Sequence, residues 1–267
     1  IGLKEKCYDQ FRHFFHSSGL KLDLLTNCWI KIVLTRFSPL KFGEYIILVA
    51  DGLKVGKEGR KMPAVKKLHQ ESNNNSKPEY IWGHSFQSIA VLVTGIFGSV
   101  FAVPLVSRIH EGIVWSNRDK KTLIDKLVNL LFTITEKIQS KAILVADNYY
   151  ANKKVILPLI KTNALHLVSR IKINAVAYYP YEQSNQKKRN GRKRKYGDKI
   201  ALRSLFNKHH LFISTFSPVY GEDKMTISYC CVDLLWRPVG QLIRFVLVKH
   251  PVRATIILMT TNLALHP

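Results

Sequence analysis

The hydrophobic and polar positions change their period several times along the chain. Between residues 5 and 37, apolar side chains recur at helical spacing and the segment 17–19 (SSG) interrupts them, which predicts a pair of helices. Residues 45–50 (YIILVA) form a short apolar run with β-branched and aromatic members, as is typical of a strand buried on both faces. Residues 141–147 (KAILVAD) predict a second strand of the same kind.

Two longer apolar segments, at 80–94 and 99–109, predict a hairpin of buried strands. No Asp, Glu, Lys or Arg lies between Glu79 and Arg108, so a membrane span is the alternative. The segment 95–98 (GIFG) splits this stretch in the middle, which suits a hairpin better than a helix.

Helical periodicity at 119–138 and 151–163, and a strand pattern at 165–171, complete the order strand, hairpin, helix, strand, helix, strand. This order predicts an α/β fold in which Asp51 and Asp147 each end a buried strand. In open α/β sheets, ligands and catalytic groups gather at the carboxyl ends of the strands.

The last third of the chain has a different pattern. Residues 183–199 contain almost no apolar side chains and predict a loop-like basic arm. Four apolar runs follow and predict strands, which we expect to be antiparallel, in an inserted or extending β-rich region at 210–216, 225–235, 242–250 and 254–261.

The charge of the chain indicates a polyanionic partner. Lys and Arg number 41 against 18 Asp and Glu, giving a formal net charge of +23. Nucleic acid fits this excess better than a membrane surface does. The four cysteines show no C-x-x-C spacing, so neither a structural zinc site nor a disulfide framework is indicated, and we expect a reducing cytoplasmic compartment.

Asp51 and Asp147 follow the same five-letter pattern, ILVAD, at 47–51 and 143–147. Side by side, two such strands would bring both carboxylates within reach of a shared metal site, the arrangement that phosphoryl transfer with two divalent ions requires. The alternative is that each aspartate only caps the turn that follows it.

Basic residues concentrate near these aspartates and in the arm, and we expect them to contact DNA phosphates. Solvated charge runs without a partner, and tyrosines that belong to the core, are the alternatives. The candidates are Lys54, Lys57, Arg60, Lys61, Lys66 and Lys67 after Asp51; Arg170 and Lys172, close to Tyr178, Tyr179 and Tyr181; and Lys187, Lys188, Arg189, Arg192, Lys193, Arg194 and Lys195 in the arm.

Several separate motifs resemble one known family. The segments VADGLKVGKEGRK, KPEYIWGHSF, ILVADNYYAN, HLVSRIKINAVAY and GRKRKYGDKIALRSLF occur in the order found in DDE-type transposases of bacterial insertion sequences. The resemblance implies an RNase H-like α/β core, with a mixed five-stranded sheet flanked by helices and a β-rich insertion. It divides the chain into a helical lead-in at 1–40, a catalytic core at 41–179, and the arm and β-rich insertion at 180–267.

In this family, Asp51 and Asp147 match the first and second catalytic aspartates. The resemblance implies that both ligate Mg²⁺ or Mn²⁺, with two ions in the intact enzyme. Water would attack the phosphodiester at the transposon end, and the freed 3′-hydroxyl would attack target DNA. The implied partners are transposon-end and target DNA, bound by a homodimer in the bacterial cytoplasm at the nucleoid, with no membrane.

The third acid of the family, a glutamate on a helix, has no counterpart in this sequence. Glu222, Asp223 and Asp233 match nothing in its motif, and the sequence stops at Pro267. We therefore expect a C-terminally truncated chain that is inactive by itself. A DNA-binding remnant without catalysis and an RNase H-like nuclease remain as alternatives.

Overall fold

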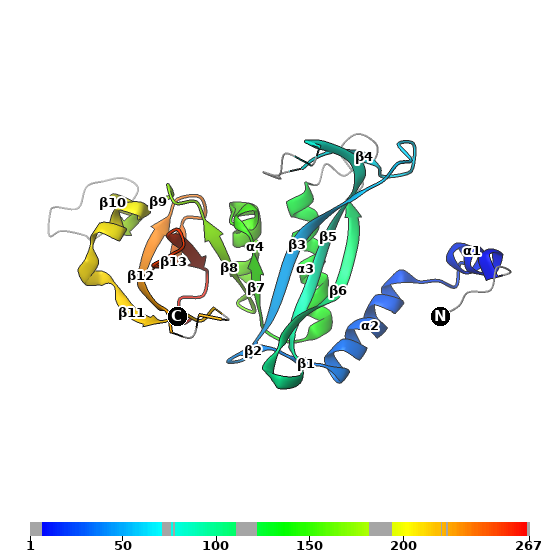
Figure 1. Cartoon of the computed structure of the whole chain (residues 1–267), viewed down its shortest axis with the longest axis horizontal. Helices are drawn as coiled ribbons and strands as arrows, with labels where there is room; N and C mark the ends of the chain where they lie inside the picture. The colour runs from blue at the N-terminus through cyan, green and yellow to red at the C-terminus, as the bar shows by residue number, and fades with distance from the viewer. Residues whose placement is uncertain are drawn as a thin grey trace.

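The computed structural model describes residues 7–70, 76, 78–110, 122–181, 194–219, 221–222 and 224–265. These residues form a mixed α/β structure built on one 14-stranded sheet (Figure 1). The predicted α/β class is therefore confirmed. Among these residues, no helix is long and apolar enough to cross a membrane.

Five neighbouring strands position the two aspartates. Their order across the sheet is β6 (Val100–His110), β5 (Tyr80–Thr94), β3 (Tyr45–Gly56), β7 (Ala142–Ala146) and β8 (Leu165–Ile171). β5 is antiparallel to β6 and β3, as the predicted hairpin requires, whereas β3, β7 and β8 are mutually parallel. Parallel neighbours need crossover connections, and helices supply them here.

The crossover helices α3 (Leu123–Ile138) and α4 (Lys153–Thr162) lie beside this part of the sheet (Figure 1). Their apolar stripes are buried in one core with the strand residues. The predicted start of α3 at residue 119 lies outside the described residues. Helix α2 (Leu22–Arg36) packs beside β6, where Trp29 Nε1 donates a hydrogen bond to the Pro104 carbonyl at 2.7 Å, and α1 (Tyr8–His16) precedes it.

The β-rich region continues the same sheet beyond β8. All pairings there are antiparallel, as predicted. The strands follow in the order β14 (Ile256–Thr260), β13 (Gln241–Lys249), β12 (Thr226–Trp236), β9 (Val176–Pro180) and β10 (Tyr196–Ala201), with β11 (Ile213–Phe216) paired to β12. One prediction is wrong here: residues 196–199, assigned to the loop-like arm, belong to β10, because β9 supplies their backbone with partners.

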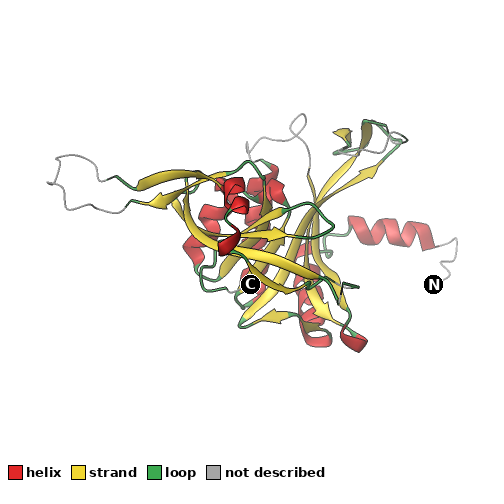
Figure 2. Ribbon diagram, turned by 60° about the vertical axis from the view of Figure 1, so that its left-hand side comes forward, coloured by secondary structure: helices red, strands yellow, loops and turns green. Residues whose placement is uncertain are grey.

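The strand predicted at residues 45–50 extends further into the polar stretch that follows it. β3 continues to Gly56 because β5 pairs with it residue by residue as far as Gly83, and β4 (Lys66–His69) pairs with the start of β5. Residues 66–69, for which the sequence predicted no strand, therefore form one. Figure 2 shows the result: a ribbon of strands β3, β4 and β5 projects from one end of the sheet and β9–β10 from the other. Two short strands, β1 (Ser38–Pro39) and β2 (Lys41–Phe42), lie at the opposite end of β3.

Candidate active site

The two aspartates lie side by side at the edge of the parallel strands. Ala50 of β3 is paired with Ala146, the last residue of β7, and Asp51 and Asp147 are the next residues along the chain. Neighbouring strands lie about 4.8 Å apart, so this register brings the two carboxylates to adjacent positions. The repeated ILVAD pattern thus corresponds to a real pair in space.

Both carboxylates are exposed, on the sheet face opposite to the helices. Side chains alternate between the faces of a strand, and Ala50 and Ala146 are buried in the core with α3 and α4. Val145, two residues before Asp147 and therefore on its face, is 39% exposed. The carboxylates thus stand on an open face that a large substrate can reach.

Each aspartate makes one local hydrogen bond. Oδ1 of Asp51 accepts from the Gly52 N–H at 2.7 Å, and Oδ1 of Asp147 accepts from the Tyr149 N–H at 3.0 Å. The second bond caps the short 3₁₀ helix η4 (Asn148–Tyr150), so the capping role weighed as an alternative is real for Asp147. Across the described parts of the chain, the other oxygen of each carboxylate accepts no hydrogen bond and forms no ion pair. These oxygens are of the type that Mg²⁺ and Mn²⁺ prefer.

A buried polar pair supports the site from the helix side of the sheet. The Tyr150 hydroxyl donates to Gln87 Oε1 at 3.1 Å, and a Cβ at Gly52 would lie 3.4 Å from Gln87 Nε2 and 3.7 Å from the Tyr150 oxygen. Burial, together with the nearby Asp51 and Asp147, raises the pKa of Tyr150 to about 12, so the hydroxyl is neutral.

Sequence reasoning missed both residues of this pair. For Gln87 a signal exists, namely a polar residue at an inward-facing position of an apolar strand, and its Nε2 is buried with no hydrogen-bond partner in the described structure. For Tyr150 the sequence carries no comparable signal.

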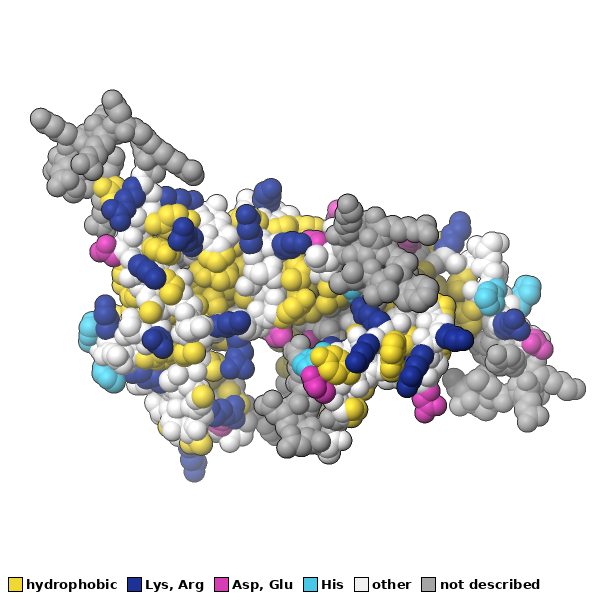
Figure 3. Space-filling view, turned by 90° about the horizontal axis from the view of Figure 1, so that it is seen from above, with side chains coloured by type: hydrophobic (Ala, Val, Ile, Leu, Met, Phe, Trp, Pro, Cys, Tyr) yellow, Lys and Arg dark blue, Asp and Glu magenta, His cyan; other side chains and the backbone are white. Residues whose placement is uncertain are grey.

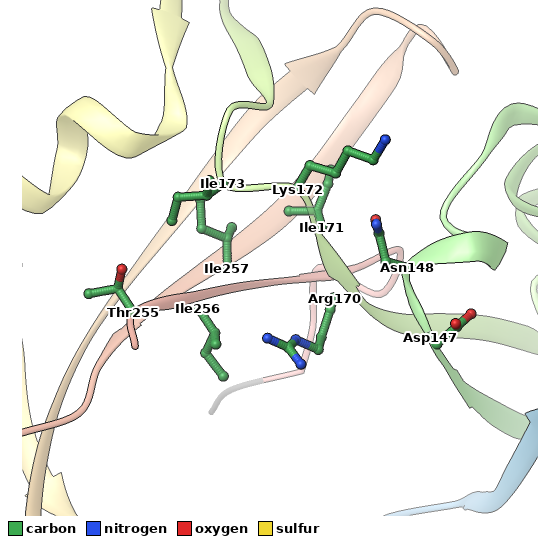
Figure 4. A pocket seen from close by; sticks show the side chains of 9 residues that line it. All are labelled: Asp147, Asn148, Arg170, Ile171, Lys172, Ile173, Thr255, Ile256 and Ile257. Carbon is green, nitrogen blue, oxygen red and sulfur yellow. The ribbon is translucent and has the colours of Figure 1, made fainter. Parts of the chain in front are cut away.

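A cavity of about 420 Å³ adjoins Asp147 (Figure 4). Its lining residues are Asp147, Asn148, Arg170, Ile171, Lys172, Ile173, Thr255, Ile256 and Ile257. Arg170 follows Ser169, which pairs with Ala146, so its backbone lies next to that of Asp147. In Figure 4 the Arg170 guanidinium and the Asp147 carboxylate nevertheless point in opposite directions. Neither Arg170 nor Lys172 forms an ion pair among the described residues, so the cavity holds two unpaired cations together with the Asp147 carboxylate.

The basic residues after Asp51 are divided between the two faces of the ribbon. Asp51 pairs with Ser88, so residues of β5 at even positions share its face. Lys67 pairs with Trp82 and lies on that face. Lys54 pairs with Ser85 and Lys66 with Gly83, and both lie on the other one.

Both lysines on the far face have hydrogen-bond partners. The Lys54 ammonium donates to the His69 carbonyl at 2.7 Å, and that of Lys66 to His110 Nδ1 at 2.6 Å. Burial, and then the charge of Lys126 on α3, lowers the pKa of Lys66. The structure thus does not bring Lys54 and Lys66 to the carboxylates.

The segment between β3 and β4 crosses β5 on the same face as Asp51. The Pro63 carbonyl lies 3.0 Å from Nε2 of His84, and His84 is one of the even positions on that face. Arg60, within this segment, lies over the Trp82 ring, while Lys57 and Lys61 are exposed. Seen from above, Lys and Arg side chains are spread across the molecule and far outnumber the acidic ones (Figure 3).

Two further predicted cations, Arg194 and Lys195, lie at the other end of the sheet. Arg194 lies over the Tyr181 ring, 5.2 Å from its centroid, and Lys195 is exposed beside it. Lys187, Lys188, Arg189, Arg192 and Lys193 lie outside the described residues, as does Asp223.

Two other acidic residues, Glu222 and Asp233, form hydrogen bonds and ion pairs within the β-rich region. Glu222 accepts a hydrogen bond from Ser217 and pairs with His250 and Arg253, and Asp233 is held by Arg244 through two bonds of 2.7 Å. The described residues contain no group of three or more His, Cys, Asp or Glu that could hold a metal ion. The aspartate pair therefore stands without a third carboxylate in this part of the chain.

Comparison with known proteins gives a family. A search of curated proteins finds no match to this chain. Residues 3–210, which include both aspartates, match the family described as DDE superfamily endonuclease. Because the match covers most of the chain and agrees with a mixed α/β sheet that carries paired carboxylates, the chain belongs to the DDE superfamily endonucleases.

Proposed function

We propose that the chain is a transposase catalytic domain that acts on DNA by metal-dependent phosphodiester hydrolysis and strand transfer. The observation that carries this proposal is the pair Asp51 and Asp147, which are in register on adjacent parallel strands and exposed on an open sheet face. The strand order β6-β5-β3-β7-β8, with only the first three antiparallel, supports an RNase H-like core at 41–179.

Asp51 and Asp147 would hold Mg²⁺ or Mn²⁺, since each keeps one carboxylate oxygen without a hydrogen bond among the described residues. Bound there, divalent ions would activate the attacking oxygen and stabilise the leaving one. The local bonds from Gly52 and Tyr149 fix the orientation of the two carboxylates. Two carboxylates supply few ligands for two ions, so we expect weak metal binding and little strand transfer without a further acid.

DNA would lie across the carboxylate face and contact its cations. We assign phosphate contacts to Lys57, Arg60, Lys61, Lys67, Arg170, Lys172, Arg194 and Lys195, and keep Lys187, Lys188, Arg189, Arg192 and Lys193 as candidates from the sequence. Lys54 and Lys66 are left out because their side chains lie on the other face and already have hydrogen-bond partners. The Arg170 and Lys172 cavity would receive a phosphate next to the reacting one. Transposon-end specificity and a homodimer on DNA remain part of the proposal.

The test substitutes each aspartate in turn, Asp51→Asn and Asp147→Asn, with Asp198→Asn, an exposed carboxylate on β10, as the matched control. Mn²⁺ binding is measured by electron paramagnetic resonance, DNA binding by fluorescence anisotropy, and Mn²⁺-dependent cleavage on supercoiled plasmid. We expect both site variants to lose Mn²⁺ binding and any cleavage while DNA affinity is kept or rises, because a negative charge facing the phosphates is removed.

Unchanged Mn²⁺ binding in both site variants would remove the carboxylate pair from the site. Absence of DNA binding by the unsubstituted chain would overturn the function itself. Products in which a 3′-hydroxyl is joined to target DNA separate a transposase from a nuclease, which yields only hydrolysis.

A further inference from the structure

Two cations on the β3–β4–β5 ribbon lie over aromatic rings. Arg60 Cζ is 5.6 Å from the centroid of the Trp82 ring, and Lys67 Nζ is 4.5 Å from that of Tyr80. Both rings belong to β5 and remain 40% and 45% exposed. Cations within about 6 Å of a ring centroid are attracted by the ring quadrupole, so each ring holds its cation at a defined place on the ribbon.

Both pairs stand on the same sheet face as the carboxylates. β3 and β5 pair without a break from Asp51 opposite Ser88 to Gly56 opposite Gly83, and β4 continues the ladder with Lys67 opposite Trp82. Trp82 and Tyr80 are six and eight residues before Ser88, so the alternation of side chains returns them to the face of Asp51. At about 3.3 Å per residue, they lie about 20 and 26 Å from it along the strand.

These two cations differ from their neighbours on the ribbon. Lys54 and Lys66, on the opposite face, bond to His69 and His110, whereas neither Arg60 nor Lys67 forms an ion pair with a described residue. The carboxylate face therefore presents two positioned cations without compensating acids. A row of uncompensated, oriented cations leading away from a phosphodiester-cutting site fits the backbone of a nucleic acid.

We infer that the ribbon binds the duplex flank of the DNA, with Arg60 and Lys67 on backbone phosphates and Trp82 and Tyr80 as the residues that position them. This inference rests on the proposed function. Since B-DNA rises about 3.4 Å per base pair, the contacts fall about six to eight base pairs from the phosphate at the carboxylates. Duplex is favoured over an unstacked base because each ring already holds a cation that a base would have to displace.

The first experiment measures how the DNA dissociation constant of the whole chain depends on salt. The slope of log affinity against log salt is negative. Arg60→Gln and Lys67→Gln should each reduce its magnitude by about 0.9, the value for one phosphate contact. Trp82→Ala should reduce the magnitude of the slope by a similar amount, because Arg60 loses the ring that holds it in place. Trp82→Phe keeps an aromatic ring and should retain the wild-type slope. Phe97→Ala is the control, since Phe97 is fully exposed at the other end of β5.

A purely structural role for Trp82 would reduce stability without changing the slope. A wild-type slope in Trp82→Ala therefore overturns the positioning role, and so does a lowered slope that Trp82→Phe fails to restore. Wild-type slopes in both Arg60→Gln and Lys67→Gln overturn the phosphate contacts.

The second experiment measures the spacing. In the variant Lys61→p-benzoylphenylalanine, light crosslinks the ribbon to a labelled duplex, and Fe²⁺ with ascorbate then cuts the DNA next to the carboxylates. Cuts about six to eight nucleotides from the crosslink, absent when Asp51→Asn is added, support the inference. Localised cuts at another spacing overturn it and leave the proposed function standing. Crosslinks without any localised cut overturn the proposed metal site, and with it the inference.

Discussion

Tyr150 and Gln87 lie directly behind the two aspartates, on the other side of the sheet, and their hydrogen bond is testable on its own. Tyr150→Phe removes the donor and leaves Oε1 of Gln87 unpaired beside an Nε2 that already has no described partner. An unsatisfied buried polar group costs about 1–3 kcal/mol, so we expect a loss of this size in the free energy of unfolding, measured with urea. Tyr149→Phe, at a side chain that is 54% exposed, should change it little.

The same residue predicts a change of stability at alkaline pH. Burial raises the pKa of Tyr150 from 10.0 to about 12 in the folded chain. The folded state therefore keeps a proton that the unfolded state releases, so this contribution to stability is complete below pH 10 and is lost as the pH rises toward 12. The difference in unfolding free energy between wild type and Tyr150→Phe should shrink over that interval. A difference that stays constant from pH 9 to pH 11.5 would contradict the assignment.

At the scale of elements, the start of α3 is fixed by a capping box that also contacts α4. The Thr122 hydroxyl accepts from the Asp125 N–H, the Asp125 carboxylate accepts from the Thr122 N–H at 2.8 Å, and Lys154 of α4 lies 3.1 Å from the same carboxylate. Thr122→Ala should cost about 1 kcal/mol in urea unfolding, and Thr122→Ser should cost much less because it keeps the cap.

The cap also predicts a loss of stability in acid. Hydrogen bonds from Thr122, with a smaller contribution from Lys154, lower the pKa of Asp125 from 3.8 to about 2. Stability from this group is present above pH 3.8 and is lost as the pH falls toward 2, because the unfolded chain takes up the proton first. The advantage of wild type over Asp125→Asn should therefore decrease between pH 4 and pH 2. If it is the same at both ends of that range, the cap does not hold the carboxylate in its charged form.

Elements whose apolar residues follow a regular period were predictable from the sequence. The hairpin of β5 and β6, the helices α2 and α4, and β8 all match, because burial of an apolar face decides their structure. The end of β3, together with β4 and β10, was missed. These polar segments become strands through pairing with a neighbour, which no local pattern reveals.

The candidate site was also predictable only in part. Two aspartates after the same apolar lead were enough to suggest neighbouring strands, and β3 and β7 are neighbours. The sequence alone could not show that Lys66 and Lys67 lie on opposite faces of the ribbon. That assignment depends on the register of β4 on β5, because a shift of one residue exchanges the two faces. Tyr150 and Gln87 meet only after the sheet has formed.

At the scale of the whole molecule, cations lie at both ends of one sheet. The β3–β4–β5 ribbon and the β9–β10 pair project from opposite ends of the sheet (Figure 2). The ribbon carries Arg60 and Lys67, and Arg194 and Lys195 directly precede β10. With a net charge of +23, a duplex long enough to reach both ends should bind with a strong salt dependence. Six or more phosphate contacts would weaken binding at least about 10³-fold between 50 and 200 mM salt.

The ribbon lies far from Tyr181 and Arg194, the described residues on either side of the arm, so DNA contacts of the ribbon and of the arm should act independently. At about 0.9 for each contact, we expect the ribbon variant Arg60→Gln/Lys67→Gln to reduce the magnitude of the salt slope by about 1.8. Replacement of five arm residues by Gln should reduce it by up to about 4.5. These residues are Lys187, Lys188, Arg189, Arg192 and Lys193. Sites far apart are additive, so the combined variant should show the sum of the two decreases on a long duplex. On a duplex too short to reach both ends, the combined decrease should be smaller than that sum. If the five arm substitutions leave the slope unchanged on every duplex, these five residues do not contact DNA, and the charge of the chain must act through its other cations.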